Sequence, residues 1–116
     1  MKTEVMFLCG LNREITFYIG THKAENFDVL DNGEPNDLWF HANEVSSCHV
    51  VASVPPDIEP KKLRYIVKAG ALLCKRYTSK IKCADNVDIL YTRVKHVAKT
   101  RHTGCVTIAE SQLIRV

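Results

Sequence analysis

The 116-residue sequence lacks the features that mark several common classes of protein. It has no apolar run near the roughly 20 residues that cross a bilayer, and residues 5–8 are too short an apolar run for a signal peptide. Its five cysteines are an odd number, lie far apart and include no C-x-x-C pair, so neither a zinc framework nor a disulfide scaffold is indicated. We expect reduced, mostly buried thiols in a cytoplasmic, or else nuclear, protein with one domain over 1–116.

Positive charge is scarce in the first half of the chain, and negative charge is scarce in the second. Residues 1–60 hold three Lys/Arg and ten Asp/Glu, a balance of −7, whereas residues 61–116 hold thirteen and three, a balance of +10. Such asymmetry is typical of a surface that faces a polyanion. An acidic half that folds over the basic half would give the same totals, so charge alone leaves both readings open.

The pattern of apolar and turn residues predicts a sheet and two helices. Runs of β-branched and aromatic residues bounded by turn residues predict strands at 5–8, 14–19, 38–42, 49–54 and 87–91, followed by a terminal hairpin of 104–109 with 112–116. A short helix is expected over 24–30, and a longer one follows Pro60. Because strands outnumber helices and mostly follow one another, we predict an α+β fold: a mostly antiparallel sheet with one long amphipathic helix and one short helix.

The longer helix has one apolar and one basic side. Leu63, Ile66, Val67, Gly70, Leu73, Cys74 and Tyr77 recur at helical spacing. The opposite side carries Lys61, Arg64, Lys68, Lys75 and Arg76, and no acid occurs between Lys61 and Lys82. We therefore expect an apolar side for the sheet and a positive side for water or a ligand.

The stretch NDLWFHANEVSSCHVVASV, residues 36–54, places one Trp and two His on two predicted strands. A turn centred on Val45 would pair Trp39 with Val51 and set His41 opposite His49. Alternation would then group Trp39, His41, His49 and Val51 on one face, and Leu38, Phe40, Val50 and Ala52 on the other. The second group is core, and the first is an aromatic and imidazole cluster.

Four roles fit this cluster. Two cross-strand imidazoles with Asp37 could bind a metal, but a regular strand would point Asp37 to the other face from His41, and no third ligand is obvious. A nuclease or other hydrolase could use His41 or His49 as a general base, but no paired carboxylate, nucleophile motif or phosphate-binding glycine loop accompanies them. The rings could also be structural, or they could recognise a ligand by stacking beside basic side chains.

The same residues resemble a known family. Asp37-Leu38-Trp39-Phe40-His41 followed by His49-Val50 is similar to the D-x-W-F-H…H-V signature of the NFACT-R domain. In the family's order, Tyr18-Ile19-Gly20 with Asn26, then Val87 to Thr92, Lys95 to Lys99 and Gly104 also match. The resemblance covers nearly the whole chain, which lacks the other modules of full-length NFACT proteins and resembles a standalone member.

The resemblance implies a nucleic-acid-binding module of proteins that work in ribosome-associated quality control, where they bind the large ribosomal subunit and tRNA. It implies that the partner is RNA, either tRNA or rRNA. DNA is an alternative, because a shorter eukaryotic coiled-coil member of the family is linked to DNA. A ribosome or an NFACT-type protein is a further expected partner. No enzymatic activity, cofactor, metal or membrane is expected.

Roles follow for individual residues as hypotheses. Phosphates are expected on Lys61, Arg64, Lys68, Lys75, Arg76, Arg93, Lys95, Lys99 and Arg101. Lys23 replaces a basic residue that the family often has directly after Gly20, and Trp39, His41 and His49 would contact a base or sugar. Gly20, Asn26 and Asp37 are expected to orient the site, with Asp37 holding a histidine or an arginine. Histidines titrate near neutrality, so mild acid should strengthen polyanion binding.

Two alternatives from other classes stay open. The first is an enzyme that acts on nucleic acid or a small phosphorylated molecule through His41 and His49. The second is a protein-interaction module, whose mark would be an exposed apolar patch or an unpaired edge strand at 112–116.

Overall fold

A computed structural model describes residues 1–116 and contains a six-stranded sheet, a separate two-stranded ribbon and two α-helices. Every strand pair is antiparallel, so the predicted α+β class is confirmed. The elements in chain order are β1 (Lys2–Leu8), β2 (Arg13–Gly20), α1 (Lys23–Asp31), β3 (Leu38–Ala42), β4 (His49–Ala52), the 3-10 turn η1 (Pro60–Lys62), α2 (Leu63–Arg76), β5 (Asp88–Arg93), the 3-10 turn η2 (Val94–His96), β6 (Val97–Lys99), β7 (Val106–Ile108) and β8 (Gln112–Arg115).

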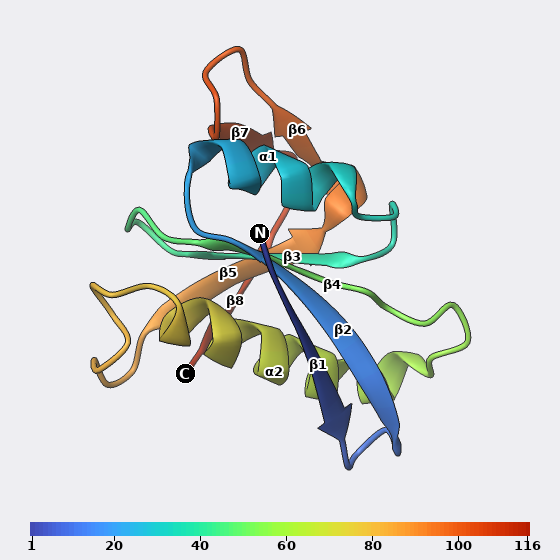
Figure 1. Ribbon diagram of the computed structural model, residues 1–116. Helices are drawn as coiled ribbons and strands as arrows, with labels where there is room; N and C mark the ends of the chain where they lie inside the picture. The colour runs from blue at the N-terminus through green and yellow to red at the C-terminus, as the bar shows by residue number, and fades with distance from the viewer.

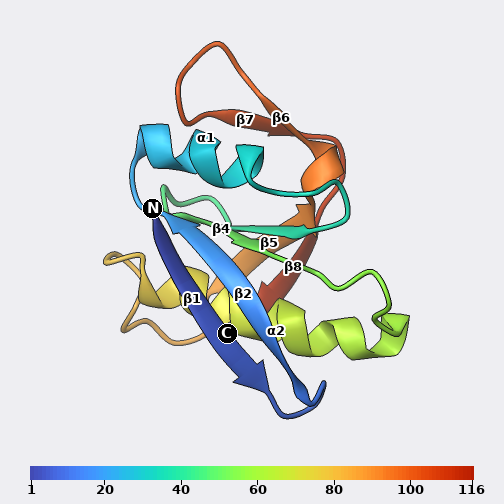
Figure 2. The same cartoon turned by 45° about the vertical axis from the view of Figure 1, so that its right-hand side comes forward.

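The main sheet has the order β1-β2-β4-β3-β5-β8 and lies between two layers. Helix α2 covers one face, and α1 together with the β6–β7 ribbon covers the other (Figure 1). A view turned by 45° shows the same layers, with the β1–β2 hairpin running away from α1 to a tip beyond α2 (Figure 2). β1 and β8 are the two edges of the sheet.

The predicted β3–β4 register is confirmed. Trp39 pairs with Val51 and Phe40 with Val50, as a turn centred on Val45 requires. The two faces of this hairpin therefore enter different cores. Phe40 and Val50 belong to the large core beneath α2, whereas Trp39 and Val51 belong to a small core beneath α1 and the ribbon.

Helix α2 lies very close to the sheet at one glycine. A Cβ placed on Gly70 would come within 2.3 Å of the Phe40 ring. The predicted apolar stripe is buried around it, with Ile66, Leu73 and Cys74 almost inaccessible. The absence of a side chain at Gly70 thus lets the Phe40 ring pack directly on the helix backbone.

Two predictions from the sequence are wrong. The last two strands do not pair with each other: β7 pairs with β6, and β8 pairs with β5. A tight turn, in which the Thr100 N–H donates to the Cys105 carbonyl and Gly104 has φ +83°, returns β7 onto β6. The thiols are not mostly buried either, because only Cys48 and Cys74 lie in the core and the other three cysteines are exposed.

Candidate nucleic-acid interface

A pocket of about 370 Å³ lies on the α1 side of the sheet and contains the predicted Trp and His cluster. We call it the Trp–His pocket. Its walls come from α1, β3, the β3–β4 loop, β4, the turn before β7, and β7. The lining residues are Lys23, Asn26, Trp39, His41, Ser46, Ser47, His49, Thr103, Gly104, Cys105, Val106 and Ile108.

Five of the predicted site residues therefore meet in one place: Lys23, Asn26, Trp39, His41 and His49. The wall formed by residues 103–108 was not predicted, because nothing in the local sequence pattern places that turn against α1. The one signal for it was Gly104, as part of the family resemblance. A Cβ on Gly104 would come within 2.9 Å of the Lys23 Cα, so the turn lies directly against the first residue of α1.

The three rings of the pocket form one contact group. The indole of Trp39 lies nearly parallel to the imidazole of His41, with ring centroids 5.7 Å apart and planes 12° apart. The His49 ring stands almost perpendicular to both, 5.2 Å from Trp39 and 5.0 Å from His41. Trp39 is only 1% exposed and His49 only 3%, whereas His41 is half-buried. The Trp39 and His49 rings therefore line the inner end of the pocket and are not exposed on the protein surface.

Hydrogen bonds fix the proton positions on both imidazoles. The indole Nε1–H of Trp39 donates to His49 Nδ1 at 3.3 Å, and because an indole can only donate, the His49 proton is on Nε2. His41 Nδ1 lies 2.6 Å from the Ala42 carbonyl oxygen, which can only accept, so the His41 proton is on Nδ1. The pocket thus offers one imidazole donor, His49 Nε2–H, and one imidazole acceptor, His41 Nε2.

Burial keeps both rings uncharged. Desolvation, with a smaller contribution from the neighbouring His41, lowers the pKa of His49 to about 3. Desolvation also lowers the pKa of His41, although its bond to the Ala42 carbonyl acts in the opposite direction. The prediction that these histidines titrate near neutrality and gain affinity for polyanions in mild acid is therefore wrong.

Asn26 reaches the pocket through a close approach of α1 to β2. A Cβ on Gly20 would come within 2.8 Å of Asn26 Oδ1 and of the Glu25 backbone, so only glycine leaves room for the helix here. Asn26 is 8% exposed, and its Oδ1 accepts no hydrogen bond from the protein. An unpaired buried amide oxygen is uncommon, because each such group is costly to leave unsatisfied.

Asp37 supports the fold next to the pocket. Its carboxylate accepts hydrogen bonds from the backbone N–H groups of Glu34 and Val54, both at 2.8 Å. It contacts neither a histidine nor an arginine through these bonds, so the predicted role of holding one of those side chains is wrong. Its carboxylate instead ties the loop before β3 to the chain after β4.

The predicted cations do not share one face. Those of α2 lie on one side of the sheet, whereas the segment after β5, formed by η2, β6 and the following turn, lies on the side of α1 (Figure 1). That segment carries Lys95, Lys99 and Arg101. Three of the predicted cations are paired with the acidic half of the chain: Lys61 with Glu59 (3.8 Å), Arg76 with Glu4 (3.9 Å), and Lys99 with Asp31. The other seven have no carboxylate partner within 4 Å: Lys23, Arg64, Lys68, Lys75, Arg93, Lys95 and Arg101.

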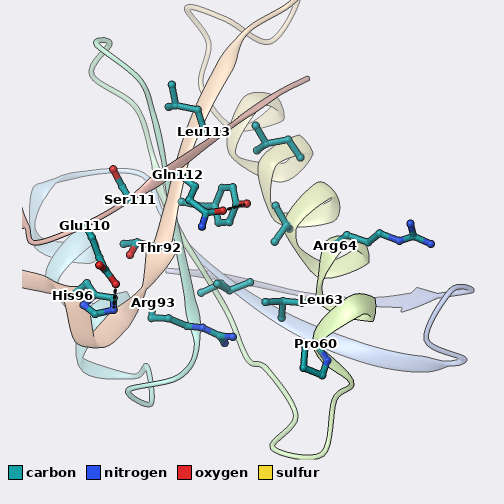
Figure 3. A pocket seen from close by; sticks show the side chains of 14 residues that line it. Pro60, Leu63, Arg64, Thr92, Arg93, His96, Glu110, Ser111, Gln112 and Leu113 are labelled. Atoms are coloured by element: carbon teal, nitrogen blue, oxygen red, sulfur yellow. Dashed lines mark hydrogen bonds and ion pairs between the residues drawn. The ribbon is translucent and has the colours of Figure 1, made fainter.

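A second pocket, of about 610 Å³, separates the start of α2 from the β5–β8 end of the sheet (Figure 3). We call it the β8 groove. Arg93 points into it and donates to the Asn36 carbonyl, whereas the Arg64 side chain extends away from its centre and donates to the Tyr65 hydroxyl at 2.9 Å. Its lining comprises Leu38, Pro60, Leu63, Arg64, Val67, Tyr91, Thr92, Arg93, His96, Glu110, Ser111, Gln112, Leu113 and Ile114.

No three His, Cys, Asp or Glu side chains come close enough together to hold a metal ion. Neither helix is long and apolar enough to pass through a bilayer.

Comparison with known proteins agrees with the geometry. Residues 5–110 match the family model described as the NFACT protein RNA-binding domain. Coiled-coil domain-containing protein 25 of Danio rerio is 33% identical over 94 residues, which are 73% of this chain and 42% of that protein. The Dictyostelium discoideum homologue of that protein is 29% identical over 105 residues, 83% of this chain and 47% of its own length. The chain thus spans less than half of the curated relatives it matches.

A solved structure shares the fold. The C-terminal part of the fibronectin/fibrinogen-binding protein from Streptococcus suis superposes with a TM-score of 0.80 at 20% sequence identity. The match covers 100% of this chain and 45% of the other. At this identity the likeness supports the fold and not a shared activity.

Proposed function

We propose that this chain, which belongs to the NFACT protein RNA-binding domain family, holds RNA on its α1 side without altering it chemically. The observation that carries the proposal is the meeting of Lys23, Asn26, Trp39, His41 and His49, far apart in sequence, in one pocket. A pocket with aromatic and hydrogen-bonding walls beside basic side chains is the usual arrangement for binding unpaired nucleotides.

Phosphate contacts are assigned first to cations that surround this pocket. Lys23 lines it, and Arg101 is exposed in the same turn as the lining residue Thr103. Neither side chain has a carboxylate partner within 4 Å, so each is free to neutralise a phosphate. Lys68 and Lys75 on α2 are equally unpaired but lie across the sheet. We therefore expect them to add long-range attraction and no direct phosphate contact.

The natural ligand we propose is tRNA or rRNA, with DNA as the competing nucleic acid. A ribosome or an NFACT-type protein would then be a second partner of the complex, and the cytoplasm, or else the nucleus, the place of action. These assignments follow from the family and from the cationic surface, and not from any residue that reads a base sequence.

The test is equilibrium binding of labelled RNA and DNA of one sequence at rising salt. We expect RNA affinity to fall linearly on a log–log plot, with a slope of about −0.7 to −0.9 per phosphate contact. The Lys23→Gln variant should reduce that slope by about one, whereas Lys80→Gln, an exposed lysine outside the site, should leave it unchanged. A flat salt response, or equal effects of the two variants, would contradict the proposal.

The same samples test for catalysis. Labelled RNA and DNA incubated with the protein and divalent metal ions should remain intact, because no Asp or Glu side chain lines the pocket beside His41 and His49. Cleavage that disappears in His41→Phe would instead establish the hydrolase alternative.

A second candidate function is favoured by the edge strand β8. The Val87 and Val116 backbones exchange hydrogen bonds of 2.8 and 2.9 Å, so by alternation the N–H and C=O groups of Leu113 and Arg115 point away from the sheet. Leu113 is 53% exposed at the β8 groove. An extended, acidic peptide could add a strand here and place a carboxylate near Arg93.

Proline at this position tests that candidate without disturbing the sheet. Leu113→Pro removes an N–H that faces outward, which an edge strand tolerates. We expect the variant to lose co-elution with an NFACT-type protein that lacks this domain, while RNA affinity is retained. Unchanged co-elution would exclude β8 as the docking edge.

A further inference from the structure

The Trp–His pocket restricts which ligands can bind in it, because its polar atoms have defined hydrogen-bonding roles. His49 Nε2–H is a donor and His41 Nε2 is an acceptor, as fixed by the bonds of the opposite ring nitrogens to Trp39 and Ala42. Neither Nε2 atom has a hydrogen-bond partner in the protein. A ligand must therefore supply an acceptor to one ring and a donor to the other.

Asn26 adds an independent observation. This residue is more than nine-tenths buried, lines the pocket, and has an amide oxygen with no donor in the protein. Oδ1 and Nδ2 of an amide exchange places when the group turns over, so the side chain can present either a donor or an acceptor to a ligand. As placed, Oδ1 lies against Gly20 with almost no accessible surface, so a ligand in the pocket would meet the amide through Nδ2, or through Oδ1 after the group has turned over.

The charge of the pocket argues against a phosphate. Lys23, at the rim, is its one permanently charged lining residue. Burial keeps His41 and His49 neutral, and the lone pair of His41 Nε2 would face the oxygens of an anion. A desolvated phosphate surrounded by neutral groups would lack the charge-assisted bonds that normally compensate for loss of its hydration.

The shape and walls fit a planar, uncharged ring. Trp39, Val106 and Ile108 supply the apolar part of the lining, with Trp39 directly beside the two imidazoles. The volume of about 370 Å³ lies at the lower end of the range found for pockets that hold small molecules. Proteins that recognise unpaired RNA insert single bases between such walls and bond their edges.

We propose that the Trp–His pocket takes one uncharged nucleobase of a single-stranded segment, while the phosphates stay outside at Lys23 and Arg101. The inference rests on the proposed function and specifies the chemical group that enters the site. A base edge that carries a donor next to an acceptor satisfies His41 Nε2, His49 Nε2–H and the Asn26 amide together.

The decisive comparison is between two RNA strands of equal length, one with all its bases and one abasic, so that ribose and phosphate are identical. We expect the intact strand to bind at least fivefold more tightly, since a stacked base contributes about 1–3 kcal/mol. Equal, measurable binding of both strands would overturn the base pocket and keep the proposed function. Binding of neither strand would overturn both.

Occupancy of the pocket can be observed directly, because Trp39 is the one tryptophan of the chain. Free adenosine, cytidine, guanosine or uridine should change its fluorescence to saturation, and inorganic phosphate should not. A saturable response to phosphate with none to any nucleoside would overturn the proposal.

A variant locates the effect within the pocket. His41→Phe keeps a flat ring and removes the acceptor, so the ratio of intact to abasic affinity should fall toward one. The matched control Lys80→Gln, on an exposed lysine remote from the pocket, should preserve the ratio. If His41→Phe leaves the ratio at its original value, with circular dichroism confirming the fold, then the preference for bases arises elsewhere and the inference fails.

Discussion

At the scale of single residues, the buried polar contact between Trp39 and His49 determines the chemistry of the site. The indole N–H occupies His49 Nδ1, which sends the imidazole proton to Nε2, and burial lowers the pKa of the ring so that it stays neutral. The sequence placed both side chains on one face of the β3–β4 hairpin, because strand alternation is a local rule. It could not give the protonation state, which depends on burial by α1 and the β6–β7 ribbon, elements remote in the chain.

Acid should destabilise the protein through His49. Its pKa is about 3 when folded and about 6.5 when unfolded, so the unfolded state binds more protons between these values. Stability is complete above pH 6.5 and falls toward pH 3, by up to about 1.4 kcal/mol per pH unit. Urea unfolding at pH 7.5 and pH 5 should show a smaller acid-induced loss for His49→Gln than for the parent. The exposed His102→Gln serves as control and should behave like the parent.

The two tautomers give a direct spectroscopic prediction. At pH 7, long-range ¹⁵N–¹H spectra should show His41 protonated at Nδ1 and His49 at Nε2, because Ala42 and Trp39 occupy the other positions. Two rings with the same tautomer, or a charged ring, would refute the donor-and-acceptor description of the pocket.

At the scale of elements, the helices and the first five strands could be predicted, whereas the partners of the last two strands could not. Local alternation marks a strand but does not say which neighbour it will pair with. The η2 turn at 94–96 interrupts alternation just before β6, so that strand was hidden within a basic segment and β7 was assigned to the wrong partner. The turn at residues 100–105, which depends on Gly104, pairs β7 with β6 instead of with β8.

The contact between α2 and the sheet depends on Gly70. Alanine normally stabilises a helix interior by about 1 kcal/mol relative to glycine. Here the added methyl group would meet the Phe40 ring, and overpacking of this kind costs about 1–3 kcal/mol. We expect Gly70→Ala to lower the free energy of unfolding, measured by urea titration. Lys68→Ala on the exposed side of the same helix should change it by less than about 0.5 kcal/mol, and a stabilised Gly70→Ala would show that the helix can move away.

At the scale of the whole molecule, the opposite charges of the two halves of the chain are only partly cancelled by folding. Glu59, Glu4 and Asp31 pair with Lys61, Arg76 and Lys99, but seven of the ten predicted cations have no carboxylate partner and lie on two sides of the sheet. The charge totals of the two halves of the sequence could predict a surface that faces a polyanion. They could not predict that the sheet would separate the cationic side chains into two groups.

This division makes a comparison between the two sides possible. Lys23→Gln with Arg101→Gln and Lys68→Gln with Lys75→Gln each remove two positive charges. If RNA lies on the α1 side, then the first pair should weaken binding at least tenfold at low salt, and the second pair should weaken it by less than threefold, since long-range attraction alone is lost. Filter binding at two salt concentrations would measure this, and the reverse order would place the RNA on α2.

The β6–β7 ribbon has one further consequence, for how such a module can change during evolution. Two strands of three residues each are too small to persist alone, so the ribbon depends on the body of the protein, while the six-stranded sheet keeps its own core beneath α2. Apart from Gly104, which the turn requires, the connection at 100–105 can therefore lengthen, shorten or exchange side chains at little expense to folding. Ligand preference can thus diversify among descendants of this scaffold while the architecture is inherited unchanged.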